Sequence, residues 1–192
     1  LQMRYRRQVQ YAMWNLLGSH DRPRFLTLCG GDVRRVLLAS TFQYTYLGTP
    51  YIYYGDEIGM EGDDDPDCRR CMPWDKQDWD EELLRHYAGL ARLRRRHSAL
   101  RRGEFTVLMA DRPESPLVYA RWNSRGNTRP CIVVALNNTD KPASIDWELV
   151  AARMRQTGVL ARWADRPMRT VWTVGAGDRS ELAPMSARVW KV

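Results

Sequence analysis

Short apolar runs and stretches of helical periodicity alternate along the first half of the chain. One apolar run covers residues 12–17 and ends at Gly18, and a β-branched and aromatic run covers 50–54 and ends at Gly55. Short apolar runs that are closed by turn residues are typical of buried parallel strands. The pattern therefore predicts two such strands, joined through a helix in a parallel β/α arrangement.

Two helices are predicted around the second strand. The first occupies 33–47, where apolar residues share one face at helical spacing, with Asp32 as its N-cap and Gly48 as its stop. The second is a long helix over 78–100 that Asp80 caps, and its acidic start and arginine-rich end complement the helix dipole.

After Gly103 the apolar pattern changes from helical to strand-like. Six short strand candidates, separated by turn-rich stretches, lie at 105–109, 117–122, 131–136, 143–147, 170–174 and 186–192. The segment Asn137-Asn138-Thr139 fits a glycosylation sequon but is interpreted as a hairpin turn. The spacing predicts an all-β antiparallel sandwich over 104–192, which follows an α/β domain over 1–103.

The chain is basic, with 30 Lys and Arg against 23 Asp and Glu and a formal net charge of +7. Nearly all of these cations are arginines, and they are spread over helix faces and strands without a DNA- or RNA-binding motif. We therefore expect no nucleic-acid partner. No segment approaches the ~18 apolar residues of a membrane span, so no membrane association is expected either.

The cysteines and acidic residues give little support to a metal site. Cys68 and Cys71 have the spacing of half a zinc site, but no second Cys or His pair lies at a fitting distance. The carboxylates at 63–67 lack the central Gly and terminal Glu of a calcium loop. Cys29 and Cys131 stand alone, as small buried residues do. No metal and no cofactor is expected.

Polar residues with several hydrogen-bonding groups follow both predicted strands. His20 and Asp21 come directly after the first strand, at the end where α/β folds place their chemistry. After the second strand, Asp65 offers two carboxylate oxygens and Arg69 a planar fork of donors. The alternative for the His–Asp pair is a capped turn without function.

Asp56 and Glu57 also follow the second strand. Adjacent residues of an extended chain point to opposite sides, so the two carboxylates are not expected to act as an acid–base pair on one bond. Trp74, in the loop beyond them, offers a face on which a sugar ring can stack, although burial is the commoner fate of a tryptophan.

Several of these segments resemble the α-amylase family of glycoside hydrolases, and most closely the branch of neopullulanase, cyclomaltodextrinase and maltogenic amylase. Residues 15–21 (NLLGSHD) resemble the family's strand-seven motif, and 48–59 its eighth barrel strand and exit loop. Asp65-Pro66-x-x-Arg69 resembles its outer-subsite motif, and 93–103 its last barrel helix. The resemblance implies the last β/α units of a TIM barrel, followed by the family's C-terminal β-domain.

The resemblance also implies roles for individual residues. His20 would contact the sugar next to the scissile bond, and Asp21 would stabilise the transition state as the third member of the catalytic carboxylates. Asp65 and Arg69 would bind a glucose two or three units from the cleavage point. The chain carries Arg22 where relatives usually have Thr, which places a guanidinium beside the site.

Members of this family cleave α-1,4 and sometimes α-1,6 glucosidic bonds with retention, in maltodextrins, cyclodextrins, pullulan or starch. Retention requires a nucleophile and an acid about 5–5.5 Å apart, and the family's motifs for both are missing from this chain. A full barrel needs about 250 residues, and the chain has 192. The resemblance therefore implies the C-terminal portion of a longer hydrolase, inactive alone, with both groups before Leu1.

The alternative is a standalone, non-enzymatic carbohydrate-binding module. In the first interpretation the partner is an α-glucan oligosaccharide or polysaccharide, and a homodimer would form through segments that precede this chain. A cytoplasmic location is expected, since no signal peptide is visible.

Overall fold

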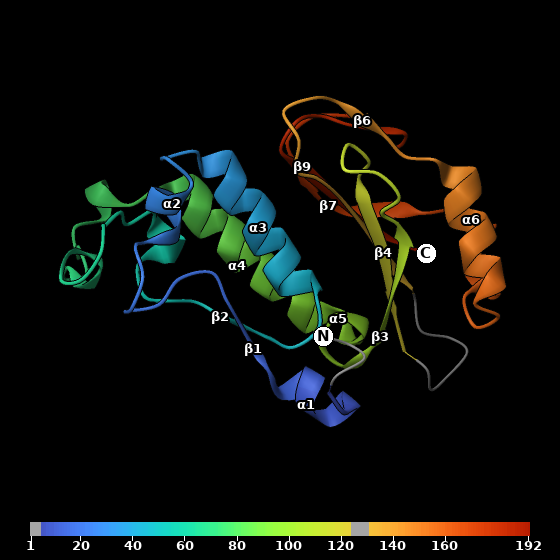
Figure 1. The fold of residues 1–192 in the computed structure, drawn as a ribbon, viewed down its shortest axis with the longest axis horizontal. Coiled ribbons are helices and arrows are strands. Elements are labelled where there is room, and N and C mark those ends of the chain that lie inside the picture. Colours follow the sequence, from blue (N-terminus) through green and yellow to red (C-terminus); the bar gives the residue numbers. More distant parts are fainter. Residues whose placement is uncertain (1–4, 124–130) are drawn as a thin grey trace. The chain divides into compact units, whose positions relative to one another are not determined.

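The structure, a computed structural model, describes residues 5–123 and 131–192. The chain forms two compact units that divide between Arg94 and Arg95. In Figure 1 the first unit consists of helices and a short pair of strands, and the second contains a twisted sheet. The elements of the first unit are α1 (Arg7–Ala12), β1 (Trp14–Leu16), α2 (Phe25–Leu28), α3 (Val33–Thr45), β2 (Thr49–Tyr51) and the 3-10 helices η1 (Asp56–Ile58), η2 (Asp67–Arg69) and η3 (Lys76–Asp78). The helix α4 (Glu81–Arg96) begins in this unit and ends two residues beyond its last residue, Arg94.

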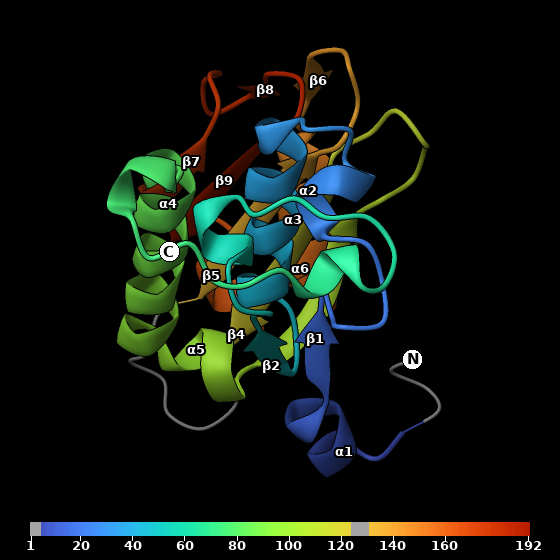
Figure 2. The same cartoon turned by 90° about the vertical axis from the view of Figure 1, so that its left-hand side faces the viewer.

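The strands β1 and β2 pair in parallel, which confirms the predicted direction. Figure 2 shows them next to one another below α3. Both are shorter than predicted, and the prediction that the first is buried is wrong, because Trp14 and Leu16 are 64% and 53% exposed. Among the described residues the pair has no further strand beside it, so its apolar side chains reach solvent.

Gln43 on α3 ties the helix to both strands. Its Nε2 donates to the carbonyl oxygens of Asn15 at 2.7 Å and Tyr51 at 2.8 Å, one in each strand. The Asn15 side chain donates in turn to the carbonyl oxygen of Leu47 at 2.5 Å. These bonds fix where both strands end, and hence where the loops after them start.

The helix α3 begins where the sequence predicts and ends earlier. The Asp32 carboxylate accepts a hydrogen bond from the Arg34 backbone N–H at 3.0 Å, which confirms the N-cap. The helix ends at Thr45, before the predicted stop at Gly48. Gly48 instead shapes the turn into β2: its φ is 87°, and an added Cβ would lie 2.6 Å from the carbonyl oxygen of Met13.

The predicted helix over 78–100 is two helices. Asp80 caps the first one, α4, since its carboxylate accepts from the Leu83 N–H at 3.0 Å. The chain becomes extended at His97 (φ −109°, ψ 103°), and α5 (Ser98–Arg102) follows. Helical periodicity alone does not reveal a one-residue break of this kind. Within the described part of the chain, no helix has both the length and the apolar character needed to cross a membrane.

An antiparallel sheet of five strands forms the second unit, as the strand-like pattern predicted. Its order is β3-β4-β5-β9-β7. The strands are β3 (Glu104–Met109), β4 (Leu117–Trp122), β5 (Ile132–Asn137), β7 (Arg169–Val174) and β9 (Ser186–Lys191). All neighbours in the sheet run antiparallel, and each strand lies within a residue or two of its predicted position.

The prediction that this part of the chain is all-β is wrong, because 147–156 forms the helix α6 (Trp147–Gln156). Only β6 (Ala143–Ser144) remains of the predicted strand there, and it pairs with β8 (Glu181–Leu182) in a separate small sheet. The Asp146 carboxylate accepts from the Leu149 N–H at 2.9 Å and starts the helix.

The segment that begins at Asn137 is not a hairpin turn, because the next strand, β6, does not pair with β5. Asn137 is 1% exposed, and its side-chain amide donates to the carbonyl oxygens of Lys141, Leu182 and Ala183. The residue joins two loops at the end of the sheet, which is why an asparagine lies buried there.

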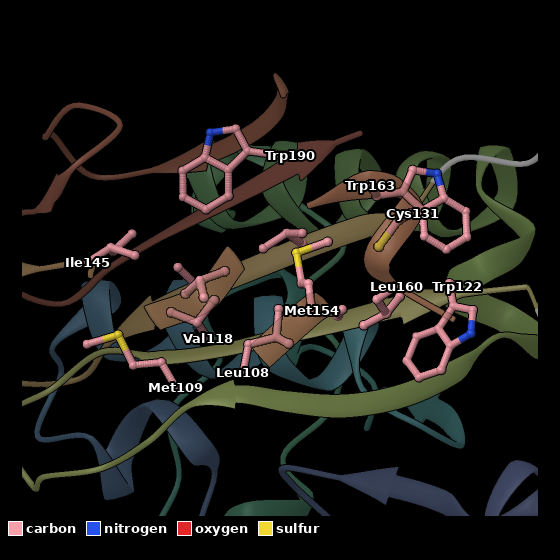
Figure 3. Close-up of a cluster of buried hydrophobic side chains, with 14 of the residues drawn as sticks. Leu108, Met109, Val118, Trp122, Cys131, Ile145, Met154, Leu160, Trp163 and Trp190 are labelled. Atoms are coloured by element: carbon pink, nitrogen blue, oxygen red, sulfur yellow. The ribbon is translucent and has the colours of Figure 1, made fainter. Parts of the chain in front are cut away.

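Apolar side chains from α6 and from the sheet pack together in the core of the second unit (Figure 3). Its fully buried or nearly buried members include Leu108, Val118, Ala120, Cys131, Val133, Ala135, Ile145, Val150, Met154, Leu160, Trp163, Leu182 and Trp190. Cys131 is one of them, in agreement with its interpretation as a small buried residue. The helix thus supplies much of the layer that a second sheet would supply in a sandwich.

Candidate functional site

The candidate site lies at the carboxyl ends of β1 and β2. Because the two strands run parallel, the loops that follow them leave the sheet at the same end. The first loop carries His20 and Asp21. The second leads through η1 to the segment that holds Asp65 and Arg69. Sequence positions more than 40 residues apart therefore meet on one rim.

Arg69 connects all the predicted site residues. Its Nε lies 3.1 Å from Asp65 Oδ1, and its Nη2 lies 3.8 Å from Asp21 Oδ1. His20 Nε2 lies 3.2 Å from the same Asp21 oxygen. The structure therefore brings together the four residues that the sequence singled out, with one guanidinium between two carboxylates.

The backbone of the first loop is also held by the second. Arg69 Nε donates to the carbonyl oxygen of His20 at 3.0 Å, and the Cys68 thiol donates to the same oxygen at 3.3 Å. Cys68 is fully buried, whereas Cys71 is exposed. The sequence pattern suggested these two cysteines only as half of a zinc site. In 5–123 and 131–192 no cluster of three or more His, Cys, Asp or Glu side chains is placed to hold a metal.

The side chains of the four site residues are open to solvent. His20, Asp21, Asp65 and Arg69 keep between 46% and 69% of their side-chain surface exposed. Exposed ion pairs of this kind contribute only about 0–1 kcal/mol. Polar groups of a ligand can therefore replace these contacts at small cost.

A second, buried ion pair lies beneath this rim, and sequence reasoning missed it. Arg24 Nη1 lies 3.2 Å from Asp56 Oδ1, with the two side chains 0% and 7% exposed. Burial raises the pKa of the Asp56 carboxyl to about 6, since the neighbouring guanidinium offsets only part of the desolvation and the charge of Glu57 adds to the shift. Asp56 does not lie on an extended chain, as the sequence pattern predicts, but begins the 3-10 helix η1.

Arg24 is enclosed by aromatic rings and backbone. Its guanidinium carbon lies 4.2 Å from the ring centre of Tyr53 and 4.5 Å from that of Tyr54. Nη1 also donates to the carbonyl oxygen of Tyr54, and the Arg24 N–H donates to the carbonyl oxygen of Gly62 at 2.8 Å. The sequence signal was an arginine three positions after Asp21, which a basic composition makes easy to overlook.

Trp74 is 80% exposed, so the expectation of burial is not met and its indole faces stay open. The backbone before it is fixed, because Trp79 Nε1 donates to the carbonyl oxygen of Pro73 at 2.7 Å. An open aromatic face of this size can stack against a ligand ring.

Two parallel β/α elements with a polar rim at their carboxyl ends are the arrangement found at the active-site end of β/α-barrel enzymes. Residues 1–103 match the family described as Alpha amylase, catalytic domain, and the chain belongs to that family.

Two curated relatives illustrate the match. The chain is 49% identical over 141 residues to a cyclomaltodextrinase of Geobacillus thermopakistaniensis, which covers 73% of this chain and 23% of the relative. It is also 49% identical over 119 residues to neopullulanase 2 of Thermoactinomyces vulgaris, covering 62% and 20%. The chain thus spans about a quarter or less of the curated relatives that it matches.

Among solved structures, the debranching enzyme from Nostoc punctiforme superposes on the whole chain with a TM-score of 0.78 at 27% identity. The match covers 100% of this chain and 38% of that one. Such neighbours identify the first unit as a fragment of a TIM barrel.

Proposed function

We propose that this chain is the C-terminal portion of a retaining α-glucan hydrolase and forms one wall of its substrate cleft. The observation that carries the proposal is the convergence of His20, Asp21, Asp65 and Arg69 on one exposed rim. Acidic and guanidinium groups in fixed geometry suit paired sugar hydroxyls. The names of the relatives, cyclomaltodextrinase and neopullulanase, support an α-glucan as the substrate class.

In this proposal Asp21 stabilises the transition state. Its carboxylate accepts hydrogen bonds from hydroxyls of the sugar at the cleavage point, and these strengthen as the ring flattens and positive charge develops. His20 lies on the same side and donates to that sugar. Asp65 and Arg69 hold a glucose two or three units away, and Trp74 offers it a stacking face.

Asp21 neither forms nor breaks the glycosidic bond. Retention needs a nucleophilic carboxylate and an acid about 5–5.5 Å apart, and this proposal assigns both to sequence outside the chain. The substrates it covers are α-1,4-linked, and in some cases α-1,6-linked, glucans such as maltodextrins, cyclodextrins, pullulan or starch.

The proposal extends to the domains. Residues 1–103 would be the last β/α units of the catalytic barrel, with β1 and β2 as its seventh and eighth strands. Residues 104–192 would be the C-terminal β-domain that follows it. The antiparallel sheet supports this assignment, while α6 replaces part of the second layer expected of a sandwich.

We place the protein in the cytoplasm. All four cysteines are free thiols, including Cys68 and Cys131, which are each buried. Free thiols are the rule in a reducing compartment, whereas secreted proteins tend to use them in disulfides.

The Asp21→Asn variant of the full-length protein tests the proposal. Its turnover of a maltooligosaccharide is expected to fall about 100-fold or more, because a neutral amide cannot stabilise the developing charge. Folding is expected to survive, since Asp21 is exposed. Reducing-sugar release measures turnover, and circular dichroism measures folding.

Asp165→Asn is the matched control for this experiment. Asp165 has 73% of its side-chain surface exposed and pairs with Arg155, much as Asp21, at 69%, pairs with Arg69. The control is expected to keep its activity. Near-normal turnover of Asp21→Asn would remove the proposed role, and a wild-type protein without activity on any α-glucan would remove the proposed function.

A further inference from the structure

The loop that carries His20 and Asp21 has little structure of its own. Between Gly18 and Arg24 the internal contacts are a hydrogen bond from the Asp21 N–H to Ser19 Oγ at 3.3 Å and the His20–Asp21 pair. Arg69 and Cys68 hold the middle of the loop at the His20 carbonyl oxygen, so the direction of the Asp21 carboxylate depends on these contacts and on what holds the two ends of the loop.

Both ends of the loop meet the same side chain, Asp56. At the start, Gly18 is packed so closely that an added Cβ would lie 2.4 Å from Asp56 Oδ2. At the end, Arg24 Nη1 lies 3.2 Å from Asp56 Oδ1. Each carboxylate oxygen thus faces one end of the loop, and the chain between them must project outward with Asp21 near its middle.

Arg24 is fixed from several directions. Its guanidinium contacts two tyrosine rings and donates to the Tyr54 carbonyl oxygen. Its backbone N–H donates to Gly62, so both ends of the residue are held in place. Its Nε and Nη2 are nevertheless buried without a hydrogen-bond partner among the described residues. Buried donors without partners cost free energy, so this arrangement is poorly explained by stability alone.

We infer that Asp56 and Arg24 are positioning residues, which clamp both ends of the Gly18–Arg24 loop and thereby aim Asp21 at the substrate. This inference rests on the proposed function, since it assigns the clamp to the residue proposed to stabilise the transition state. Neither Asp56 nor Arg24 touches the substrate in this arrangement. Both act through the backbone of the loop.

The clamp requires Asp56 to be ionised. Burial raises the pKa of its carboxyl to about 6, so the ion pair with Arg24 weakens as the pH falls through this value. The other ionisable groups that act on it or feel its charge are Glu57, next to it in η1, and Tyr87 on α4. The pKa of Tyr87 is raised by burial, so its phenol stays neutral while Asp56 titrates.

Three variants of the full-length protein test the clamp. Asp56→Asn removes the charge, Arg24→Lys keeps a cation but loses the planar contacts with both rings, and Gly18→Ala pushes on the carboxylate from the other end without changing any charge. For each we expect kcat on a maltooligosaccharide to fall about 10- to 100-fold, with KM changed less than about threefold. In wild type we expect kcat to fall as the pH drops through about 6, because Asp56 becomes protonated. This fall is expected to be absent in Asp56→Asn.

Amide hydrogen exchange supplies a readout that needs no activity. The Arg24 N–H, which donates to Gly62, is expected to exchange about tenfold faster or more in each variant. Asp32→Ala, which removes the N-cap of α3 and has no contact with the loop in the structure, is the control for a loss of stability alone. It is expected to leave both kcat and Arg24 exchange unchanged.

The outcomes separate the clamp from the proposed function. If wild type hydrolyses α-glucans and Asp21→Asn does not, but the three clamp variants keep their kcat and their Arg24 protection, the clamp is wrong and the proposed function stands. If wild type has no activity, Arg24 exchange still decides: unchanged protection in Asp56→Asn and Gly18→Ala overturns the clamp. If Asp56→Asn does not fold, Gly18→Ala and Arg24→Lys carry the test.

Discussion

Arg69 is the side chain on which the rim depends. One guanidinium lies between Asp65 and Asp21 and also donates to the His20 backbone. Such a planar fork fixes several acceptors at once, whereas the ammonium group of lysine acts as a point charge. The geometry of Arg69, and not its charge alone, therefore shapes the surface that is proposed to face a sugar.

Replacing Arg69 by lysine is expected to weaken substrate binding more than chemistry. KM for a maltooligosaccharide should rise roughly tenfold, because the outer contact is made equally in ground and transition states, while kcat falls by a smaller factor, because Arg69 also donates to the His20 backbone beside Asp21. Arg70→Lys is the matched control, since Arg70 pairs with Asp67 at 2.6 Å and has no contact with His20 or Asp21 in the structure. An unchanged KM in Arg69→Lys would show that charge alone matters, and equal effects of both variants would show that the effect is not specific to Arg69.

Asp56 makes a prediction about stability and pH. Its folded-state pKa, about 6, lies above its ordinary value of 3.8, so between these values the folded protein holds a proton that the unfolded chain has lost. The contribution of Asp56 to the free energy of unfolding is therefore greatest below about pH 4. It falls as the pH rises to 6, by up to about 3 kcal/mol.

The measurement is the free energy of urea unfolding between pH 4 and 7, for wild type and for Asp56→Asn. The difference between the two is needed because His86, whose pKa is lowered to about 4 by burial, has the opposite slope in this range. Wild type should lose stability relative to the variant as the pH rises to 6. A difference that does not depend on pH would mean that Asp56 titrates normally.

At the scale of single elements, α6 forms where the sequence pattern predicts the end of a strand. The segment 143–147 was predicted as a strand because it is short and partly apolar. The helix signals were present nevertheless: Asp146 as an N-cap, Glu148 in the first turn, and arginines in the last. The local pattern does not decide between a strand and a helix here, and the strand candidates on either side favour the strand.

Removing the Asp146 cap is expected to destabilise the second unit. In Asp146→Ala the Leu149 N–H loses its acceptor, and the free energy of unfolding should fall by about 1 kcal/mol. Glu114→Ala, an exposed position in the β3–β4 loop, is the control and should change it by less than about 0.5 kcal/mol. Urea unfolding followed by tryptophan fluorescence measures both. An unchanged midpoint for Asp146→Ala would argue that the cap is dispensable.

Other elements followed from the sequence because their signals are local. The parallel direction of β1 and β2 follows from short apolar runs separated by a helix, and the caps Asp32 and Asp80 follow from side-chain chemistry. The break at His97 lies between two helical segments, and no local sequence signal marks it.

At the scale of the whole molecule, the sequence singles out the four exposed residues of the rim but not the buried ion pair of Arg24 and Asp56. That His20, Asp21, Asp65 and Arg69 meet follows from parallel strands, whose exits lie at one end, and from the family resemblance. The pairing of Arg24 with Asp56 is different, because it links positions 32 residues apart through burial that no local pattern encodes. A buried ion pair is visible only once the chain around it has folded.

The two units also differ in how completely they bury their apolar surface. The core of the second unit is built from residues of that unit alone, and Trp163 and Trp190 are almost fully buried within it. The first unit exposes Trp14, Leu16 and other apolar side chains around a pair of strands. Open strand edges with apolar side chains favour association with other chains.

We therefore expect residues 95–192 to fold when expressed alone and residues 1–94 to aggregate. The first fragment should show one cooperative urea transition, because its core needs no side chain from elsewhere. Trp163→Ala in this fragment should lower its free energy of unfolding by about 3–5 kcal/mol, or abolish the transition, since it removes a large buried side chain from that core. Sedimentation and circular dichroism distinguish folded monomer from aggregate. A monomeric, cooperative 1–94 fragment beside an unfolded 95–192 fragment would reverse the assignment of the independent core, and would mean that the exposed strands of the first unit need no covering partner.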